Sequence, residues 1–208
     1  MDRHVKYRPF ESRDARDLAG VISDTWKFDS GAAGLRWSAH INYAYLYVCM
    51  LEADYTQVAE IDGHAVGIII GRICGKGFRP LIALKLLYHS AVLLISGIYR
   101  KVGHLFNGYA EKSDILDEMS GVTKGDFDAE AALFIVSKEF RGYGVGSFLF
   151  GSLERFFCEK GVRHYYLHTD TACNYAFYEH KGLKRRAEIH TEISYAGVDD
   201  ITMFVYGK

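Results

Sequence analysis

The sequence has little proline, almost no net charge and no paired cysteines, and each shortage excludes a class of protein. Pro9 and Pro80 are its only two prolines, so no proline-rich linker or low-complexity segment divides it. The formal net charge of −1 at pH 7 excludes the broad basic surface of a non-specific nucleic-acid-binding protein. The 208 residues, 49% of them hydrophobic, therefore predict one soluble globular domain that buries a full core.

The cysteines and the N-terminus give no sign of metal binding or export. Cys49, Cys74, Cys158 and Cys173 form neither a CxxC pair nor the spacing of a metal site, so we expect no disulfide framework and no metal. Isolated thiols of this kind are typical of a reducing compartment. Residues 1–10 lack the apolar run of a signal peptide, and we expect a cytoplasmic protein.

One hydrophobic run, residues 81–98, is about as long as a short transmembrane helix. However, Lys85, His89, Ser96 and Arg100 fall within a narrow arc when successive residues are placed 100° apart on a helix. A polar stripe of this kind predicts a helix packed against protein rather than surrounded by lipid. We therefore expect no membrane span, with contact to a membrane surface as the alternative.

The N-terminal part of the chain predicts a strand, two helices and a hairpin. A short, partly β-branched segment at 5–10 predicts the first strand, and apolar residues at helical spacing predict helices at 11–26 and 38–51. The hairpin turns at Asp62-Gly63, between TQVAEI and AVGIIIGRI. Its second arm is apolar at nearly every position, which predicts a central strand.

Residues 76–125 break this pattern and are interpreted as a helical insertion, with candidate helices at 81–98 and 113–120. The chain beyond it predicts a strand at 129–137, a helix at 147–160, a strand at 162–169, a helix at 172–181, and two closing strands around Ala196-Gly197. This order predicts a single domain over 1–208 of the α+β class. Its central sheet should be mixed and mostly antiparallel, with helices on both faces.

A glycine-rich loop, RGYGVGS at 141–147, lies between a buried strand and the start of a helix. Glycine lets the backbone turn sharply and approach a ligand closely. The unpaired N–H groups and the dipole at the helix N-terminus favour an anion there, and pyrophosphate is the natural guest. Alone, the pattern is explained as well by a tight turn.

A Rossmann dinucleotide site is a weaker interpretation of the same loop. That site needs GxGxxG and an acidic residue about twenty positions further on, followed by more parallel strands. Here Ser147 stands at the third glycine, Val162 stands near the acidic position, and only an antiparallel pair of strands follows.

Two motifs together give a more specific resemblance. The strand–RGYGVG–helix unit is similar to the RGxGhG signature of GNAT N-acetyltransferases, where h is aliphatic. Residues 177–183, FYEHKGL, resemble that family's FYExxGF element. The resemblance is sharp over 128–190, only architectural over 5–73 and absent over the insertion. It implies the GNAT (acyl-CoA N-acyltransferase) fold and acetyl transfer from the co-substrate acetyl-CoA to an amine.

The resemblance also implies roles for residues around the glycine loop. Main-chain groups of Phe134, Ile135 and Val136 would bind the pantetheine arm and thioester, with an N–H near Ile135 stabilising the oxyanion. The pyrophosphate would be held by the loop itself, which comprises Arg141, Gly142, Tyr143, Gly144, Val145, Gly146 and Ser147. Asn174 would contact the cofactor in place of the family's asparagine, whose usual position is Thr171 here. Thr171 and Asp170 are alternatively helix N-caps.

Tyr178 matches the tyrosine that protonates the departing thiolate in this family, and its alternative role is aromatic core packing. A base is also needed, because an alkyl amine is mostly protonated at neutral pH. Glu130, six residues before Val136, is placed like the catalytic glutamate of histone-acetylating members, and a solvated strand end is the alternative. His168 on the next strand is the second candidate base.

The acceptor is not indicated by any motif. Trp26, Phe28, Tyr43 and Tyr45 either shape its pocket or pack in the core, and the apolar insertion either covers this site or forms a homodimer interface. The leading hypothesis is an acetyltransferase acting on a primary amine of a small molecule or peptide, by direct attack through a tetrahedral intermediate. The alternatives are a non-catalytic acetyl-CoA-binding sensor or interaction module, and a nucleotide-binding protein of another family.

Overall fold

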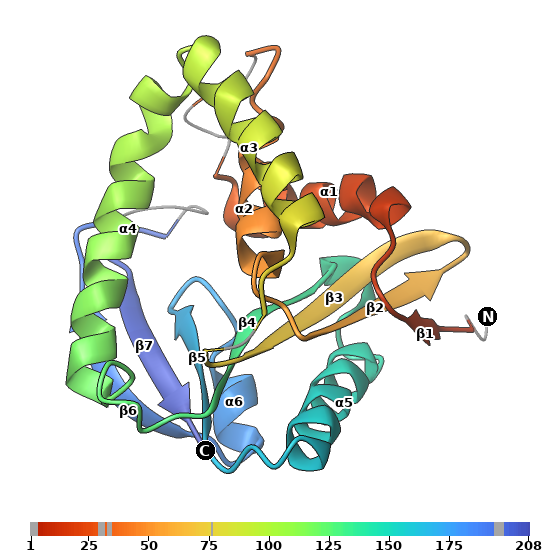
Figure 1. The fold of residues 1–208 in the computed structure, drawn as a ribbon, viewed down its shortest axis with the longest axis vertical. Coiled ribbons are helices and arrows are strands. Elements are labelled where there is room, and N and C mark those ends of the chain that lie inside the picture. Colours follow the sequence, from red (N-terminus) through yellow and green to blue (C-terminus); the bar gives the residue numbers. More distant parts are fainter. Residues whose placement is uncertain (1–3, 29–31, 33–34, 76, 194–197) are drawn as a thin grey trace.

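The computed structural model describes residues 4–28, 32, 35–75, 77–193 and 198–208. They form one seven-stranded sheet with the order β1-β2-β3-β4-β5-β7-β6 (Figure 1). Neighbouring strands are antiparallel, except that β4 and β5 run parallel. The strands are β1 (Lys6–Arg8), β2 (Tyr55–Ile61), β3 (His64–Ile73), β4 (Ala129–Val136), β5 (Tyr165–Asp170), β6 (Lys184–His190) and β7 (Thr202–Gly207).

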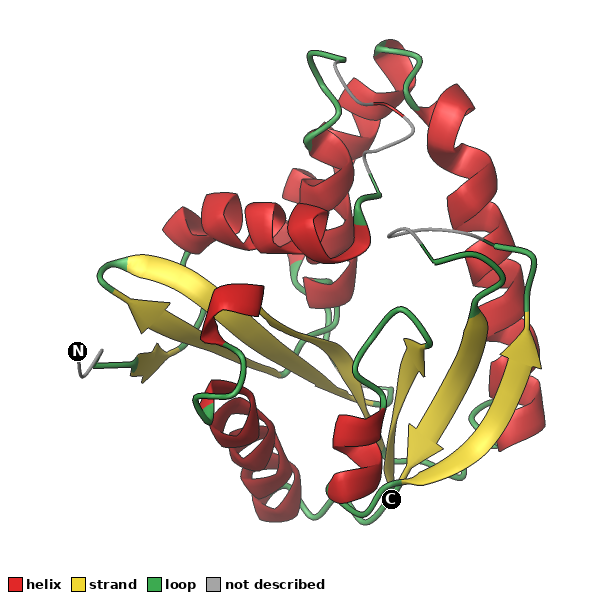
Figure 2. Ribbon diagram, turned by 180° about the vertical axis from the view of Figure 1, so that it is seen from behind, coloured by secondary structure: helices red, strands yellow, loops and turns green. Residues whose placement is uncertain are grey.

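Helices cover both faces of the sheet, which confirms the fold class predicted from the sequence (Figure 2). The helix α1 (Ala15–Trp26) follows the short helix η1 (Ser12–Asp14), and with α2 (His40–Met50) it packs on β3 and β4. Another helix, α5 (Val145–Glu159), packs on β2, β3 and β4 through a separate apolar cluster that also contains Tyr178 of α6 (Ala176–His180). The sheet is therefore the middle layer of the fold.

The hairpin of β2 and β3 turns where the sequence predicts. Asp62 and Gly63 both adopt positive φ, 52° and 84°, as a two-residue hairpin turn with the twist of the flanking strands requires. Residues 65–70 of β3 are buried, since helices cover that strand on both faces. The strand is therefore central, as its continuous apolar run predicts.

The parallel pair β4 and β5 is joined over a short distance. Among the described residues the two strands form only two pairs, Ala129 with Tyr165 and Glu130 with Tyr166, both at the beginning of the strands. Beyond these pairs the strands diverge, while β4 continues to pair with β3 as far as Val136. The divergence opens the centre of the sheet, and this opening positions the site described below.

The segment interpreted from the sequence as an insertion forms two helices, α3 (Pro80–Ile95) and α4 (Tyr99–Ser120), where the sequence predicts helices at 81–98 and 113–120. The first agrees closely with the predicted helix at 81–98. The second begins at residue 99, whereas the sequence predicts only 113–120, because Gly103 and Gly108 weaken the local signal. Packing of α4 on β6 and β7 stabilises the longer helix, which descends beside the sheet edge in Figure 1.

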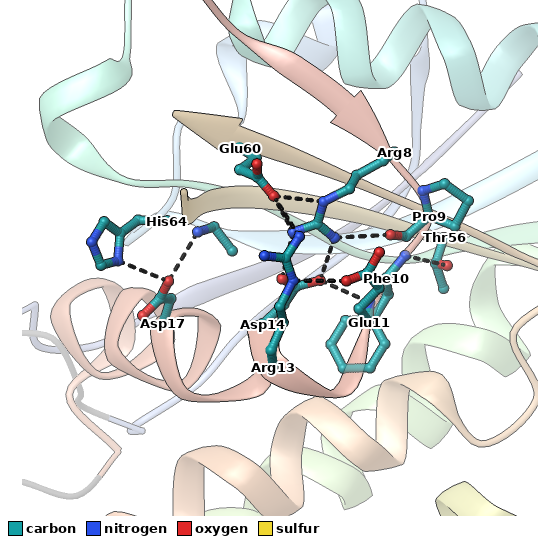
Figure 3. A network of polar contacts seen from close by, with 11 residues as sticks. Arg8, Pro9, Phe10, Glu11, Arg13, Asp14, Asp17, Thr56, Glu60 and His64 are labelled. Atoms are coloured by element: carbon teal, nitrogen blue, oxygen red, sulfur yellow. Dashed lines mark hydrogen bonds and ion pairs between the residues drawn. The ribbon is translucent and has the colours of Figure 1, made fainter. Parts of the chain in front are cut away.

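A buried polar network anchors the first strand to the start of the first helix (Figure 3). Arg8 donates from two guanidinium nitrogens to the two carboxylate oxygens of Asp14, both at 2.7 Å, and from Nε to Glu60 at 2.6 Å. Arg8 and Asp14 are 8% and 3% exposed. A paired, bidentate arrangement of this kind satisfies charges that would be costly to bury alone.

Candidate active site

A cavity of about 620 Å³ passes through the gap between β4 and β5. One end lies against the glycine loop and the N-terminus of α5, lined by Gly142, Gly144, Gly146 and Ser147. The other end lies under helices of the opposite face, where Tyr45 of α2 and Tyr109 of α4 line it. The cavity thus reaches both faces of the sheet.

The glycine loop has the geometry of an anion site. Gly142 and Gly144 have φ values of 83° and 81°, which residues with a Cβ rarely adopt. Within α5 the first i→i−4 bond runs from the N–H of Phe148 to the carbonyl of Gly144, so the N–H groups of residues 145–147 precede the regular ladder. These donors and the helix dipole favour a negative group at this end of the cavity.

The edge of β4 that faces the cavity carries main-chain groups of alternate residues. The N–H of Ser137 donates to Val66 of β3, and Ile135 lies opposite Ile68 in the same register. Because the direction of N–H groups alternates along a strand, Ile135 also points to β3. The N–H groups of Phe134 and Val136 therefore face the opening, one residue on either side of the donor expected from the sequence.

Arg141 fixes the end of this edge. Its Nε donates to the carbonyl of Val136 at 3.0 Å, which uses one of the five guanidinium N–H donors. The same side chain lines the cavity beside Lys138. Positive charge is thereby gathered at the end where the helix dipole is also positive.

The opposite end of the cavity is aromatic. Trp26, Phe28 and Tyr45 pack against one another with ring centroids 5.0 to 5.6 Å apart. Burial raises the pKa values of the Tyr45 and Tyr109 hydroxyls, so both stay neutral. Asp170 is 2% exposed and accepts a hydrogen bond from the N–H of Ala172 at 2.8 Å. This bond forms a turn where the sequence predicts the first residues of a helix, and α6 begins only at Ala176.

Tyr178 lines the cavity. It is 8% exposed, and its ring lies 6.4 Å from that of Phe134 on β4 and 5.9 Å from that of Phe150 on α5. Burial, followed by the nearby Cys173 and Asp170, raises the pKa of its hydroxyl well above the ordinary value. The phenol is therefore a proton donor across the physiological pH range.

A chain of charged side chains leads into the cavity from the sheet. Glu130 pairs with Arg72 of β3, and its other oxygen lies 3.9 Å from Nδ1 of His168. Nε2 of His168 lies 2.8 Å from Asp117 of α4. Burial alone would lower the pKa of His168, but the two carboxylates outweigh it and raise that pKa to about 9.

Glu130 itself is held in its charged form. Burial pushes its pKa upward, and the contacts with His168 and Arg72 outweigh that effect, so the pKa lies below the ordinary value. His168 lines the cavity, whereas Glu130 is not among the described residues that line it. His168 therefore stands between the cavity and Glu130.

The structure brings most of the sequence-predicted site residues to one cavity. Those that line it are Phe134, Ile135, Val136, Arg141, Gly142, Gly144, Gly146, Ser147, Asn174 and Tyr178. Tyr143 is 80% exposed and Val145 packs in the core, so neither lines it. Tyr109 and Asp117 were missed, because they lie in the insertion, where no motif marks them.

Two comparisons bear on this arrangement. Residues 22–183 match the family model described as the Acetyltransferase (GNAT) family. No curated protein matches the chain in sequence. The match covers well over half of the chain, and the chain therefore belongs to the GNAT acetyltransferase family.

Solved structures show the same fold. Arabidopsis thaliana NAA60 in complex with a bisubstrate analogue is 13% identical with a TM-score of 0.54, over 99% of this chain and 97% of that one. The N-acetyltransferase of Staphylococcus aureus Mu50 is 12% identical with a TM-score of 0.53, over 99% and 98%. The ribosomal-protein-S18-alanine N-acetyltransferase of Escherichia coli is 10% identical with a TM-score of 0.54, over 98% and 92%.

Proposed function

We propose that this protein transfers the acetyl group of acetyl-CoA to a primary amine of a small molecule or peptide. The observation that carries the proposal is the continuous cavity, which joins an anion site at the N-terminus of α5 to a buried aromatic end through the open edge of β4. Acetyl-CoA supplies an activated thioester. The chain has to bind it, stabilise negative charge and move two protons.

The residues present fit acetyl-CoA. The loop glycines and Arg141 suit its pyrophosphate, because N–H donors and a guanidinium meet at this end. The N–H groups of Phe134 and Val136 suit the amide groups of the pantetheine arm and the thioester carbonyl. Removing one N–H donor to the developing oxyanion typically lowers the rate by about 10²–10³-fold.

The reaction then needs one nucleophile and one acid. The neutral amine attacks the carbonyl carbon, a C–N bond forms, and the tetrahedral intermediate collapses with loss of the C–S bond. Tyr178 is proposed to give its proton to the departing thiolate, since burial raises the pKa of its hydroxyl and keeps that proton in place until the thiolate forms; solvent returns the proton to Tyr178 after the products leave. Asn174, at the cavity wall next to α6, is proposed as a further contact to the cofactor.

Direct attack is favoured over an acetyl-cysteine intermediate by the state of the thiol in the cavity. Cys173 lines the cavity, but burial raises its pKa to about 12, with Asp170 adding to the effect. A protonated thiol is a poor nucleophile. The proposal therefore expects that no acetylated enzyme accumulates when acetyl-CoA is added without an amine.

The proton released by the amine is proposed to pass to His168, with Glu130 as the positioning residue behind it. His168 lines the cavity and Glu130 lies 3.9 Å from its Nδ1. Because a base must be unprotonated to act, and the pKa of His168 is raised to about 9, the rate should rise with pH toward that value.

The first test is calorimetric titration of the purified chain with acetyl-CoA, with NAD and ATP as controls. Saturable binding of acetyl-CoA alone, followed by release of free thiol when amines are added, supports the proposal. Binding without turnover on a broad amine panel would make the chain an acetyl-CoA-binding module. Binding of NAD or ATP in place of acetyl-CoA would refute the assignment of the glycine loop.

A further inference from the structure

The helix α3 has its polar side against the protein and its apolar side outward. Lys85 donates from Nζ to the hydroxyl of Ser12 at 2.8 Å. His89 lies with its Nδ1 2.9 Å from Nδ1 of His40, and its ring stacks on Tyr43 at 4.8 Å. Lys85 and His89, the first two residues of the polar stripe, therefore face η1 and α2. An ordinary surface helix instead turns its apolar side toward the protein.

The outward side of α3 is apolar along its whole length. Six large side chains are between 59% and 88% exposed, and at 100° per residue they fall within an arc of about 140°. We call this arc the outer face of α3; it comprises Leu81, Leu84, Leu87, Tyr88, Leu94 and Ile95. A contiguous apolar surface of this kind marks an interaction site.

The charged residues of the segment that carries the outer face have one sign. Residues 79–110 include Arg79, Lys85, Arg100 and Lys101 and contain no aspartate or glutamate, although the whole chain has a net charge of −1. Arg79 directly precedes α3, and Arg100 and Lys101 follow its end. Exposed aromatic rings, Phe78 and Tyr99, stand beside these basic residues. Basic and aromatic residues that flank an apolar face match the interface between lipid headgroups and chains.

The same charges argue against a second copy of the chain as the occupant. If two α3 helices packed antiparallel on their outer faces, Arg79 of one would lie beside Arg100 and Lys101 of the other. If they packed parallel, identical basic ends would meet. Either pairing brings together like charges within a segment that has no acidic residue to compensate them.

We propose that the outer face of α3 binds the surface of an anionic lipid membrane. The six apolar side chains would enter the boundary between headgroups and chains, and Arg79, Arg100 and Lys101 would lie on lipid phosphates and carboxylates. Among the described residues no single helix is long and apolar enough to cross a membrane, and α3 and α4 pass that test only as a pair bent by 99°. The proposed contact lies along the surface, because the exposed apolar side chains occupy one side of α3.

The test is flotation of the full chain with phosphatidylcholine vesicles, with or without about one-third phosphatidylserine. We expect the chain to float with the anionic vesicles and to remain mostly unbound with the neutral ones. Higher salt should weaken the binding, because dissolved ions screen the attraction between the basic residues and the anionic lipids. At 0.1 M salt the Debye length is about 10 Å.

Variants separate the apolar and basic contributions. Leu87→Gln with Ile95→Gln removes two of the most exposed apolar side chains and should lower the partition coefficient at least about tenfold. The matched control is Val48→Gln with Met119→Gln, which removes two exposed apolar residues outside the outer face and should bind like the unchanged chain. Arg100→Glu with Lys101→Glu should remove the preference for anionic vesicles.

Three results would overturn the proposal. The first is no flotation with either vesicle, and the second is equal flotation of the outer-face variant and its control. The third is a stable dimer in sedimentation that only the outer-face variant dissociates, which would make this face an interface between copies. Thermal unfolding of each variant verifies that it is folded, and none of these readouts depends on the proposed acetyl transfer.

Discussion

At the scale of single residues, Tyr178 offers the most direct test of the chemistry. We expect Tyr178→Phe to lower kcat about 10²–10⁴-fold, because the phenyl ring keeps the packing and loses only the proton donor. Affinity for acetyl-CoA, measured by calorimetry, should stay close to that of the unchanged enzyme. Tyr88→Phe removes an exposed hydroxyl outside the cavity and serves as the control. Equal kcat values for the two variants would reduce Tyr178 to a core aromatic.

Gly142 tests the anion site in the same way. At φ 83° an added Cβ strains the backbone even though open space surrounds it, at a cost of about 1–2 kcal/mol. Gly142→Ala should therefore weaken acetyl-CoA binding about tenfold, as a shift in the calorimetric Kd. Gly151→Ala adds the same methyl group within α5, also in open space and without positive φ, and should leave Kd unchanged. A loss in both variants would point to general destabilisation instead.

At the scale of elements, the contact between α4 and the sheet should depend on pH. The folded pKa of His168 is about 9, above the ordinary 6.5, so the stabilisation from Asp117 and Glu130 is complete below about pH 6.5. It is lost as pH rises through 9. We expect the melting temperature to fall progressively between about pH 6.5 and about pH 9, over which up to about 3 kcal/mol of stability is lost, and to level off above that.

Asp117→Asn should flatten this pH dependence, because one of the two carboxylates that hold the imidazolium is gone. Asp114→Asn, an exposed change one turn earlier on α4, should leave it as it is. If both variants keep the same pH profile as the unchanged chain, the loss of stability at high pH has another source.

The elements also show which parts of the structure the sequence could predict. The Asp62-Gly63 hairpin, the buried strand β4 and the glycine start of α5 depend on local backbone chemistry, so they could be located from residue patterns alone. The cavity residues Tyr109 and Ile193 come from the insertion and from the segment between β6 and β7. They meet the site only through the path of the chain in three dimensions, which no local pattern encodes.

The case of α3 shows a second limit. The spacing of Lys85 and His89 predicts a polar stripe correctly, but a stripe does not state which side of the helix faces the protein. Glu130 is similar: its spacing from Val136 places it on β4, while only the structure shows that Arg72 holds it and that His168 stands between it and the cavity. The orientation of α3 and the surroundings of Glu130 both depend on residues that are distant in sequence.

At the scale of the whole molecule, the opening between β4 and β5 should make stability respond to ligand. A ligand that binds only the folded state at one hundred times its Kd adds about 2.7 kcal/mol to the free energy of unfolding. We expect acetyl-CoA to raise the melting temperature and to slow hydrogen exchange at Phe134 and Val136, whose N–H groups face the opening. Slowing confined to the N-terminus of α5 would place the ligand on the loop alone.

The cavity reaches both faces of the sheet, and this has a kinetic consequence. In the proposed reaction the glycine loop would receive the cofactor on the side of α5, whereas the aromatic end lies under α1, α2 and α4. Two substrates that approach from opposite faces can occupy the enzyme together, so initial-rate plots at several fixed amine concentrations should intersect rather than run parallel. For the same reason the acetylated amine does not have to wait for the spent cofactor, and neither product should trap the other inside.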